Sequence, residues 1–387
     1  MQYDVIIAGG GMVGSTLACL LGQAGKRVAV LEAHEPPPFQ PDDAYDLRVS
    51  AISRASQRAL NEAGAWQGVV ARRARPYEAM FVWDGTGDGQ IRFDSADLGE
   101  ADLGHIVENR IIQLALLEQI RKLDTVDLYC PSKLANFSID QQQVSVKLDT
   151  SEQLSAHLLV GADGAQSKVR ELAGIYLKTE DYGQSGLVCV VKTELSHEST
   201  AWQRFMPTGP LAFLPLGDGS SSIVWTLPSD KADAVLRLET DAFKEALAQA
   251  LDYRLGAITA VGARAAFPLR GRHAEPYVQE RIALVGDAAH TIHPLAGQGV
   301  NLGIKDAAEL AHQILNHPAD CGSMQVLRAY ERARKGENVV TQKTMEGFRL
   351  LFGNNLMPWQ VLRNKGLNLV NGMNFLKYQI ARQALGI

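Results

Sequence analysis

A glycine-rich turn close to the start of the chain limits the fold more than any other feature of the sequence. The turn is Gly9-Gly10-Gly11-Met12-Val13-Gly14, and it lies between an apolar run at residues 5–8 and a helix-like run at residues 15–21. A second apolar run at residues 27–31 ends in Glu32. Strand, tight turn, helix and strand in this order are typical of a βαβ unit that binds a dinucleotide. A tight turn without a ligand is the alternative.

Each glycine of this turn has a separate role in the dinucleotide interpretation. Gly9 permits the sharp turn, Gly11 lets the backbone approach a pyrophosphate, and Gly14 allows the helix to pack closely on the strand. Met12 and Val13 begin that helix, and its free amide groups would face the phosphates. We therefore count these five residues among the predicted cofactor-binding residues.

Glu32 is the sixth predicted cofactor-binding residue. An acidic side chain at the end of the second strand can accept hydrogen bonds from the ribose hydroxyls of the adenosine. For that reason a 2′-phosphate is not expected on this ribose.

Two further glycine-aspartate motifs follow buried strands later in the chain. Gly161-Ala162-Asp163-Gly164 comes directly after an apolar run at residues 158–160. Gly286-Asp287-Ala288-Ala289-His290 comes after the apolar residues 282–285 and leads through a glycine-containing loop into a long helix-like run. The chain therefore has three glycine-rich motifs, each at the end of a predicted strand.

Composition is that of an ordinary globular protein, and the 387 residues are enough for two domains or one unit of two lobes. The net charge of -5 gives no case for a nucleic-acid partner. No run of about 18 apolar residues predicts a transmembrane helix. The first strand is predicted to begin at Tyr3, so no signal peptide and a cytoplasmic location are expected. Neither a metal site nor a disulfide framework is predicted from the four widely spaced cysteines, which are Cys19, Cys130, Cys189 and Cys321.

The order of apolar runs and turns predicts three parts. Strand-like runs at residues 79–103 and 185–274 predict a second, largely antiparallel sheet that could wall a substrate cavity. Residues 346–387 are predicted to form a C-terminal helical segment. The remaining residues are predicted to form one discontinuous nucleotide-binding domain, over 1–78, 104–184 and 275–345.

The three motifs together resemble those of the flavoprotein aromatic hydroxylases, also called single-component FAD-dependent monooxygenases, over most of the chain. Residues 47–53, 104–109 and 289–303 are similar to the ubiquinone-biosynthesis hydroxylases of that family, above all to those that modify position C5 of a polyprenylphenol ring. The resemblance implies an α/β fold with a Rossmann-like FAD-binding domain of the glutathione-reductase type. It also implies an inserted antiparallel β-sheet substrate domain, as in para-hydroxybenzoate hydroxylase, and the C-terminal helical segment. Hydroxylation at C6 or C1 is the alternative, because the shared motifs concern the flavin and not the ring position.

The resemblance also assigns site residues. It implies that Asp287 binds the ribityl chain of FAD, with an N-cap aspartate as the alternative. Arg48 would lie near the flavin or its phosphates, unless it is a solvated loop arginine. Arg110 begins a helix at a place where family members often contact FAD. No separate nicotinamide domain is expected.

Two further segments receive roles from the resemblance. Asp163 would link the binding of FAD and of the reduced pyridine nucleotide through Ser167 and Arg170. The loop before the long helix would pass its amides and the helix N-terminus beside the flavin, where partial positive charge stabilises reduced flavin. Its predicted cofactor-binding residues are Pro294, Gly297, Gly299, Val300 and Asn301.

The family chemistry implies that NADPH or NADH reduces FAD, and that O2 then reacts at flavin C4a and gives one oxygen atom to an electron-rich phenol. No catalytic side chain is assigned. A hydroxylase of a small aromatic acid is one alternative, and would need a cation such as Arg204 or Arg264. A noncatalytic flavoprotein scaffold is another. Candidate walls of the cavity for the implied polyprenylated phenol are Phe213, Pro215, Trp225 and Pro294.

The C-terminal segment has an unusual charge pattern, because residues 347–387 contain five basic residues and no acidic one, between many apolar side chains. Such a tail suits an anionic membrane surface, a prenyl-lipid channel or a partner protein of a biosynthetic complex. Peripheral contact with the inner membrane is then expected. Helices packed on the core are the alternative.

His290 and His293 could share one helix face as metal ligands. Because no third ligand cluster accompanies them, we predict hydrogen-bonded structural histidines and no metal.

Overall fold

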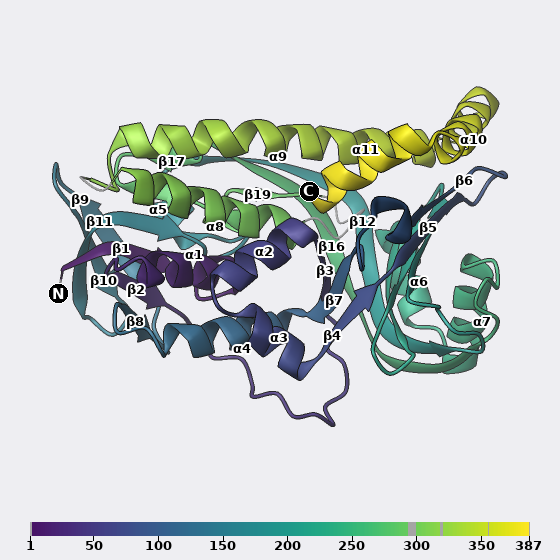
Figure 1. The fold of residues 1–387 in the computed structure, drawn as a ribbon, viewed down its shortest axis with the longest axis horizontal. Coiled ribbons are helices and arrows are strands. Elements are labelled where there is room, and N and C mark those ends of the chain that lie inside the picture. Colours follow the sequence, from purple (N-terminus) through teal and green to yellow (C-terminus); the bar gives the residue numbers. More distant parts are fainter. Residues whose placement is uncertain (1, 293–298, 318–319, 355, 387) are drawn as a thin grey trace.

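The computed structural model describes residues 2–292, 299–317, 320–354 and 356–386 (Figure 1). These residues form two eight-stranded sheets, one three-stranded sheet and a set of helices that ends in the C-terminal tail. The two large sheets lie at opposite ends of the molecule. The predicted α/β fold with an additional antiparallel sheet and C-terminal helices is confirmed.

The first sheet is the predicted nucleotide-binding sheet. Its parallel centre has the order β18-β11-β1-β2-β8, and the glycine turn connects β1 to α1 (Met12–Gln23). The apolar runs that predicted these strands are buried because helices cover both faces of such a sheet. The strands are β1 (Gln2–Ala8), β2 (Val28–Leu31), β8 (Val126–Tyr129), β9 (Leu134–Ile139), β10 (Val144–Leu148), β11 (Gln153–Gly161), β17 (Val278–Gln279) and β18 (Ile282–Leu284).

Helices from distant parts of the chain pack on this sheet. The first helix, α1, contacts both α4 (Asn109–Ile120) and α8 (Gly299–Asn316), and α8 in turn contacts α9 (Met324–Gly353). Three short helices complete this half of the molecule: α2 (Arg54–Glu62), α3 (Trp66–Arg72) and α5 (Lys168–Leu172). The beginning and the end of the predicted domain are thereby joined in one core.

The second large sheet is mostly antiparallel, as predicted, with the order β19-β16-β12-β15-β14-β13-β5-β6. One pair differs from the expectation, because β5 joins β13 in parallel. The predicted domain boundary at residues 184 and 185 falls inside the 18-residue strand β12. The strands are β5 (Ala79–Asp84), β6 (Gln90–Asp94), β12 (Tyr176–Thr193), β13 (Thr200–Met206), β14 (Gly209–Pro215), β15 (Ser221–Pro228), β16 (Ile258–Glu275) and β19 (His290–Thr291).

Helices α6 (Ser229–Leu236) and α7 (Thr240–Ala250) cover one face of this sheet. The other face turns toward the nucleotide-binding half. Between the halves lies the small sheet β3-β7-β4, formed by β3 (Val49–Ile52), β7 (Gly104–Glu108) and β4 (Ala74–Tyr77). The segment that begins β3 therefore brings Arg48 to the boundary between the two halves.

The tail continues from α9 into α10 (Met357–Gly372) and α11 (Asn374–Leu385), at the upper edge of Figure 1. Helix α10 lies against β6, and the anchor is an ion pair between Arg363 Nε and Asp84 Oδ2 at 2.5 Å. Both side chains are almost fully buried. Arg363 also donates to the carbonyls of Leu351 and Asn354, so one guanidinium ties α9, α10 and the sheet together.

We expect Arg363→Met to release the tail. Removing one partner of a buried ion pair leaves Asp84 uncompensated, and such losses typically cost about 3–5 kcal/mol. Limited proteolysis with mass detection should show faster cleavage near residues 353–357 than in the wild type. Arg382→Met, in the exposed part of α11, is the control and should be cut at the wild-type rate. Equal rates for all three proteins would contradict this role for Arg363.

Candidate functional site

The two glycine-rich motifs from opposite ends of the chain meet at Val13. A Cβ atom at Gly303 would lie 2.6 Å from Cγ2 of Val13, and one at Gly286 would lie 3.2 Å from the same atom. The side chain of Val13 therefore fills a hollow that exists because both positions are glycine. The start of α1, the Gly-Asp motif and the start of α8 form one packed unit.

The glycine turn itself combines close packing with open space. Gly9 has φ +106°, and a Cβ at Gly14 would lie only 2.0 Å from the carbonyl oxygen of Gly9. Gly11 is different, because a Cβ there would meet no atom within 4 Å. Close packing thus requires Gly9 and Gly14, whereas the space above Gly11 and the start of α1 at Met12 is free for a phosphate group.

Glu32 lies beside this turn, as the motif predicts. One of its carboxylate oxygens accepts a hydrogen bond from Gly10 N at 2.7 Å and the other accepts from His34 N at 3.0 Å. Gln113 of α4 donates to the carbonyl oxygen of Gly10, which steadies the turn from a third element. The predicted bond from Glu32 to the ribose stays a prediction.

The Asp-Gly motif is tied to the Gly-Asp motif by a buried arginine. Arg170 donates to the carbonyl oxygens of Ala288 and Ala165 at 2.9 and 3.0 Å. Asp163 Oδ2 accepts from two backbone amides at the start of α5, while its Oδ1 is buried and has no hydrogen-bond partner among the described residues. Ser167 Oγ caps the same helix. These side chains hold the two motifs together, and the predicted link to the pyridine nucleotide stays a prediction.

Arg48 and Asp287 come together with two residues that the sequence did not single out. The guanidinium of Arg48 lies 5.4 Å from the ring centre of Phe267 on β16, and Arg48 and Arg272 both interact electrostatically with Asp287. The Asp287 side chain is exposed, yet it lies so deep among protein groups that burial raises its pKa, partly offset by His290, Arg48 and Arg272. An exposed carboxylate in such a recess is a hydrogen-bond acceptor that faces ligand space.

Arg110 is not part of this group. Its guanidinium binds the carboxylates of Asp46 and Asp43 at 3.0 and 3.1 Å and also donates to the carbonyl oxygen of Pro38. The arginine therefore holds the loop around residues 36–46 against the start of α4. A contact with FAD would have to be made in addition to these bonds.

The start of α8 has one open and one buried position. A Cβ at Gly299 would meet no atom within 4 Å, and Val300 packs partly against the core. Asn301 is buried, accepts from Ser53 N at 3.0 Å and donates to Ala51 O at 2.8 Å. Asn301 thus aligns the start of α8 with the end of β3. His293, Pro294 and Gly297 lie outside the described residues.

A buried carboxylate on α8, Asp306, was missed from the sequence. One of its oxygens accepts from His290 Nε2 at 2.5 Å and from Gly286 N at 3.1 Å. The other oxygen accepts from Arg334 Nε at 2.9 Å and from Asn338 Nδ2 at 3.2 Å, both on α9. Burial opposes ionisation, but His290 and Arg334 outweigh it and lower the pKa of Asp306.

The signal for Asp306 was present in the sequence. The residue stands on the buried stripe of α8, one turn from Leu302 and from Leu310. An acidic residue on an apolar stripe is seldom accommodated without partners. His290 is therefore a hydrogen-bonded structural histidine, as predicted.

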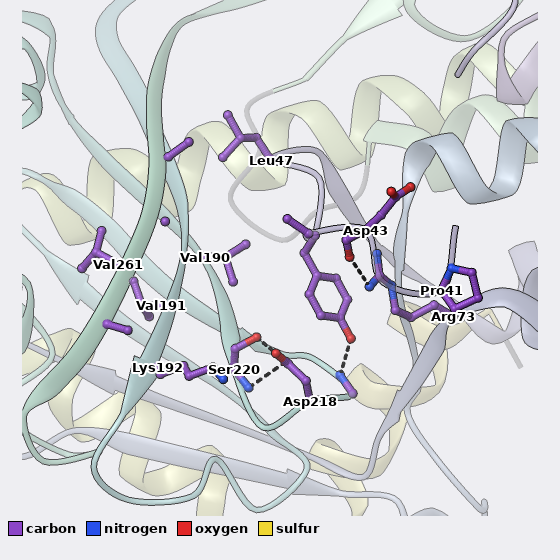
Figure 2. Close-up of a pocket in the computed structure, with 16 residues that line it drawn as sticks. Pro41, Asp43, Leu47, Arg73, Val190, Val191, Lys192, Asp218, Ser220 and Val261 are labelled. Carbon is purple, nitrogen blue, oxygen red and sulfur yellow. Dashed lines mark hydrogen bonds between the residues drawn. The ribbon is translucent and has the colours of Figure 1, made fainter. Parts of the chain in front are cut away.

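A cavity with a volume of about 760 Å³ lies between the second sheet and the loop around residues 41–47 (Figure 2). Val190, Val191 and Val261 lie along the strands, and Asp43 and Arg73 lie on the opposite side. Leu47, directly before Arg48, also lines it. One wall of the cavity is therefore continuous in sequence with Arg48.

Three of the predicted wall residues, Phe213, Pro215 and Trp225, do not line this cavity. Phe213 and Trp225 are buried on the other face of the sheet, against α6 and α7, and Pro215 is buried at the end of β14. The reason is the two-residue period of a strand, in which Ala212 and Leu214 point away from Phe213. The hydrophobic pattern located the strand, but it did not show which face of the sheet packs against α6 and α7 and which face lines the cavity.

The residues present fit FAD. Gly11 and Gly299 leave free space at the starts of α1 and α8, and the buried Oδ1 of Asp163 has no hydrogen-bond partner among the described residues. Gly9 lies against Asp163, and Val13 lies against Gly286, which precedes Asp287, so these groups stand on adjoining segments. Among the residues described, no three His, Cys, Asp or Glu side chains cluster as metal ligands would. In the same part of the chain, no helix combines the length and the hydropathy required to cross a bilayer.

We expect Gly11→Ala to weaken FAD binding without unfolding the protein. Its Cβ has room in the free protein, so the free energy of unfolding should fall by at most about 1 kcal/mol, the cost of alanine at a helix N-cap. The dissociation constant for FAD, measured by flavin fluorescence quenching, should rise at least about tenfold because the methyl group occupies phosphate space. Gly14→Ala should lose stability as well, because its Cβ collides with Gly9. Unchanged FAD affinity in Gly11→Ala would count against the phosphate site.

Asp306→Asn should lower the free energy of unfolding by about 3–5 kcal/mol, because the buried carboxylate that pairs with Arg334 and His290 would be lost, and Arg334 would keep only Glu337, which is partly exposed. Urea denaturation of the apoprotein measures this. The control on the same helix is Glu309→Gln, whose partner is Gln313, and it should change stability by less than about 0.5 kcal/mol. Equal effects of the two substitutions would contradict the role of Asp306.

Comparison with known proteins gives the family. A family model described as an FAD binding domain matches residues 2–345. The 3-demethoxyubiquinol 3-hydroxylase of Escherichia coli is 39% identical and is covered over 98% of its length by 99% of this chain. Ubiquinone hydroxylase UbiL of Rhodospirillum rubrum is 36% identical, over 99% of this chain and 89% of the relative.

Solved structures share the fold. The p-nitrophenol 4-monooxygenase PnpA of Pseudomonas putida superposes with a TM-score of 0.80 at 20% identity, over 99% of this chain and 97% of that chain. PqsL of Pseudomonas aeruginosa, in complex with 2-aminobenzoylacetate, gives a TM-score of 0.78 at 23% identity, over 95% and 99% of the two chains. With the family model and the relatives, the chain belongs to the FAD-dependent aromatic-ring monooxygenases that include the ubiquinone-biosynthesis hydroxylases, enzymes that use NAD(P)H as reductant.

Proposed function

We propose that this enzyme hydroxylates the ring of a polyprenylated phenol in ubiquinone biosynthesis, with FAD, NADPH or NADH, and O2. The observation that carries the proposal is the apolar part of the cavity wall, which includes Leu47, the residue before Arg48. Val190, on the face of β12 that points away from the α6–α7 core, and Leu47 contribute to it. An isoprenoid chain gains free energy on such a wall because its apolar surface leaves water. The names of the relatives in Escherichia coli and Rhodospirillum rubrum support the same substrate class.

The alternative of a small aromatic acid is less well supported, because the cations suggested for its carboxylate have other partners. Arg204 donates to the carbonyl oxygens of Gln249 and Ala250. Arg264 donates to Leu238 O and lies over the Phe243 ring, on the face covered by α6 and α7. Of the cations in the cavity wall, Arg73 binds Glu108 through two nitrogens, and Lys192 interacts with Asp218.

Bound FAD, once reduced by NAD(P)H, supplies the oxygen-activating chemistry. The chain would hold it through the turn at Gly11, the Asp287 carboxylate and the start of α8. Arg48 would position the ring system, because its guanidinium already lies on Phe267 at the edge of the substrate sheet. The apolar wall would keep water away from the reacting atoms.

The proposed ring position is C5, and a second candidate rests on a relative's name. The relative in Escherichia coli is named as a hydroxylase at position 3 of a 3-demethoxyubiquinol, and the motifs that it shares concern the cofactor. Hydroxylation at C6 or C1 also stays open.

We place the enzyme in the cytoplasm, in peripheral contact with the inner membrane or with other proteins of the pathway. A polyprenylated phenol has to be taken from a bilayer or from a carrier, which supports both contacts.

The decisive experiment is anaerobic reduction of the FAD-loaded protein by NADPH or NADH, with and without a short-chain polyprenylphenol, followed by O2 and mass analysis of the ring product. A hydroxylated phenol is expected, and its fragmentation gives the ring position. Reduction without any hydroxylated phenol or demethoxyubiquinol would contradict the proposal. If neither NADPH nor NADH reduces the flavin, a noncatalytic scaffold is favoured.

Narrowing the cavity should discriminate between substrates by their tails. We expect Val190→Phe to raise the KM for a prenylated phenol about tenfold, the scale of one or two misfitted methylene groups, and to leave a prenyl-free phenol nearly unaffected. Steady-state NAD(P)H oxidation coupled to product analysis measures both. Val70→Phe, on the exposed side of α3, is the matched control. An equal rise in KM for both phenols in Val190→Phe would contradict a role for this cavity in binding the prenyl tail.

A further inference from the structure

The side of α10 that faces the protein carries several polar residues, beside Leu367 and Val370, which pack against the apolar cluster around Phe205 and Phe352. Most of the other large apolar side chains of α10 are exposed to solvent. On the inner side, three asparagines at the spacing of helix turns accept from consecutive parts of one strand: Asn364 Oδ1 from Gly89 N, Asn368 Oδ1 from Gln90 N and Asn371 Oδ1 from Arg92 N. Arg363, also on this side, binds Asp84. A surface helix usually covers the core with its apolar face, whereas α10 leaves more large apolar side chains exposed than it packs against the core.

The outer side of α10 and the adjoining part of α11 expose large apolar side chains. Leu362 and Leu369, two turns apart, are 59% and 64% exposed, and Lys365 lies between them on the same face. Neighbouring members of the surface are Leu356, Met357, Trp359, Met373, Phe375, Leu376 and Ile380, of which Phe375 is 77% exposed. We call these residues, with Leu362, Lys365 and Leu369, the α10–α11 surface.

The charge on this surface has one sign. No acidic residue occurs from residue 347 to the end of the chain. Three of the five basic residues there are paired with carboxylates elsewhere, namely Arg349 with Glu180, Arg363 with Asp84 and Lys377 with Asp97. Lys365 makes no ion pair among the described residues, and it projects from the centre of the apolar side chains. Arg382 is exposed on α11.

From this arrangement we propose that the α10–α11 surface docks on the surface of a lipid bilayer that carries anionic headgroups. Leucine, methionine, tryptophan and phenylalanine side chains next to lysine are the side chains that enter the interface of such a bilayer. A second copy of this chain is a poorer occupant, because a two-fold interface sets the same surface against itself and would bring Lys365 toward its own copy.

The inference rests on the proposed peripheral contact with the membrane and names the surface that makes it, but it does not depend on the ring position or on the substrate. In Figure 1, α10 lies at the opposite edge of the molecule from the loop around residues 36–46 beside the cavity. Docking through α10–α11 would leave that loop clear of the bilayer. The test therefore needs neither substrate nor turnover.

Flotation of the FAD-loaded full chain with vesicles tests the proposal. Wild-type protein should float with vesicles that contain both phosphatidylcholine and phosphatidylglycerol. It should bind at least about tenfold less to vesicles of phosphatidylcholine alone, and at least about tenfold less to the mixed vesicles at high salt. Leu362→Gln with Leu369→Gln should lower the partition coefficient at least about tenfold, and Lys365→Glu should abolish the preference for the anionic lipid. The matched control, Val70→Gln with Leu195→Gln, changes equally exposed side chains elsewhere and should bind as the wild type does.

Flavin content and circular dichroism melting curves show that each variant is folded. No binding of the wild type to either vesicle, or equal binding of the wild type and the Leu362 and Leu369 variant, would overturn the proposal. Sedimentation velocity without lipid tests whether the α10–α11 surface binds a second copy of the chain instead. A dimer that these same substitutions dissociate would also overturn the proposal and assign the surface to a second copy. A wild-type monomer that floats supports it.

Discussion

The site depends on one buried carboxylate. Asp306 receives four hydrogen bonds, and they come from two segments: the Gly-Asp motif, at Gly286 and His290, and α9, at Arg334 and Asn338. A charge in a dry interior is tolerated only when its surroundings neutralise and satisfy it. Because α8 itself carries the carboxylate, helix, motif and α9 must assemble together, and this assembly sets where Asp287 points.

Much of the fold and part of the site could be predicted from the sequence. The turn at Gly9 to Gly14 and the burial of the parallel strands follow from local pattern, because only one backbone arrangement satisfies that spacing of glycines. The face of the second sheet on which Phe213 and Trp225 lie could not be predicted from local pattern. Strand residues alternate, and a single sequence does not say which face a ligand will share. Asp306 could have been found from its position on an apolar stripe, whereas Phe267 and Arg272 reach Arg48 and Asp287 only through tertiary structure.

The second sheet separates two different environments. One face, with Phe213, is closed by α6 and α7 into a dry core that fixes the shape of the sheet. Part of the other face, with Val190, lines the cavity, whereas α9 and α10 cover the part of that face near β5, β6 and β13. The rigid side of the sheet thus stabilises the side that has to accept a ligand, since a wall that repacked freely would not hold a ring in one position.

The asparagines of α10 have a consequence for how the protein behaves among its own copies. Strand β6 is the last strand of its sheet, so its outer amide groups would otherwise be free to pair with another chain. Asn364, Asn368 and Asn371 occupy those amides. Loss of the tail by proteolysis or truncation would uncover a ready template for intermolecular β-pairing. A shortened form of this chain is therefore at risk of aggregation even though its nucleotide-binding core is complete.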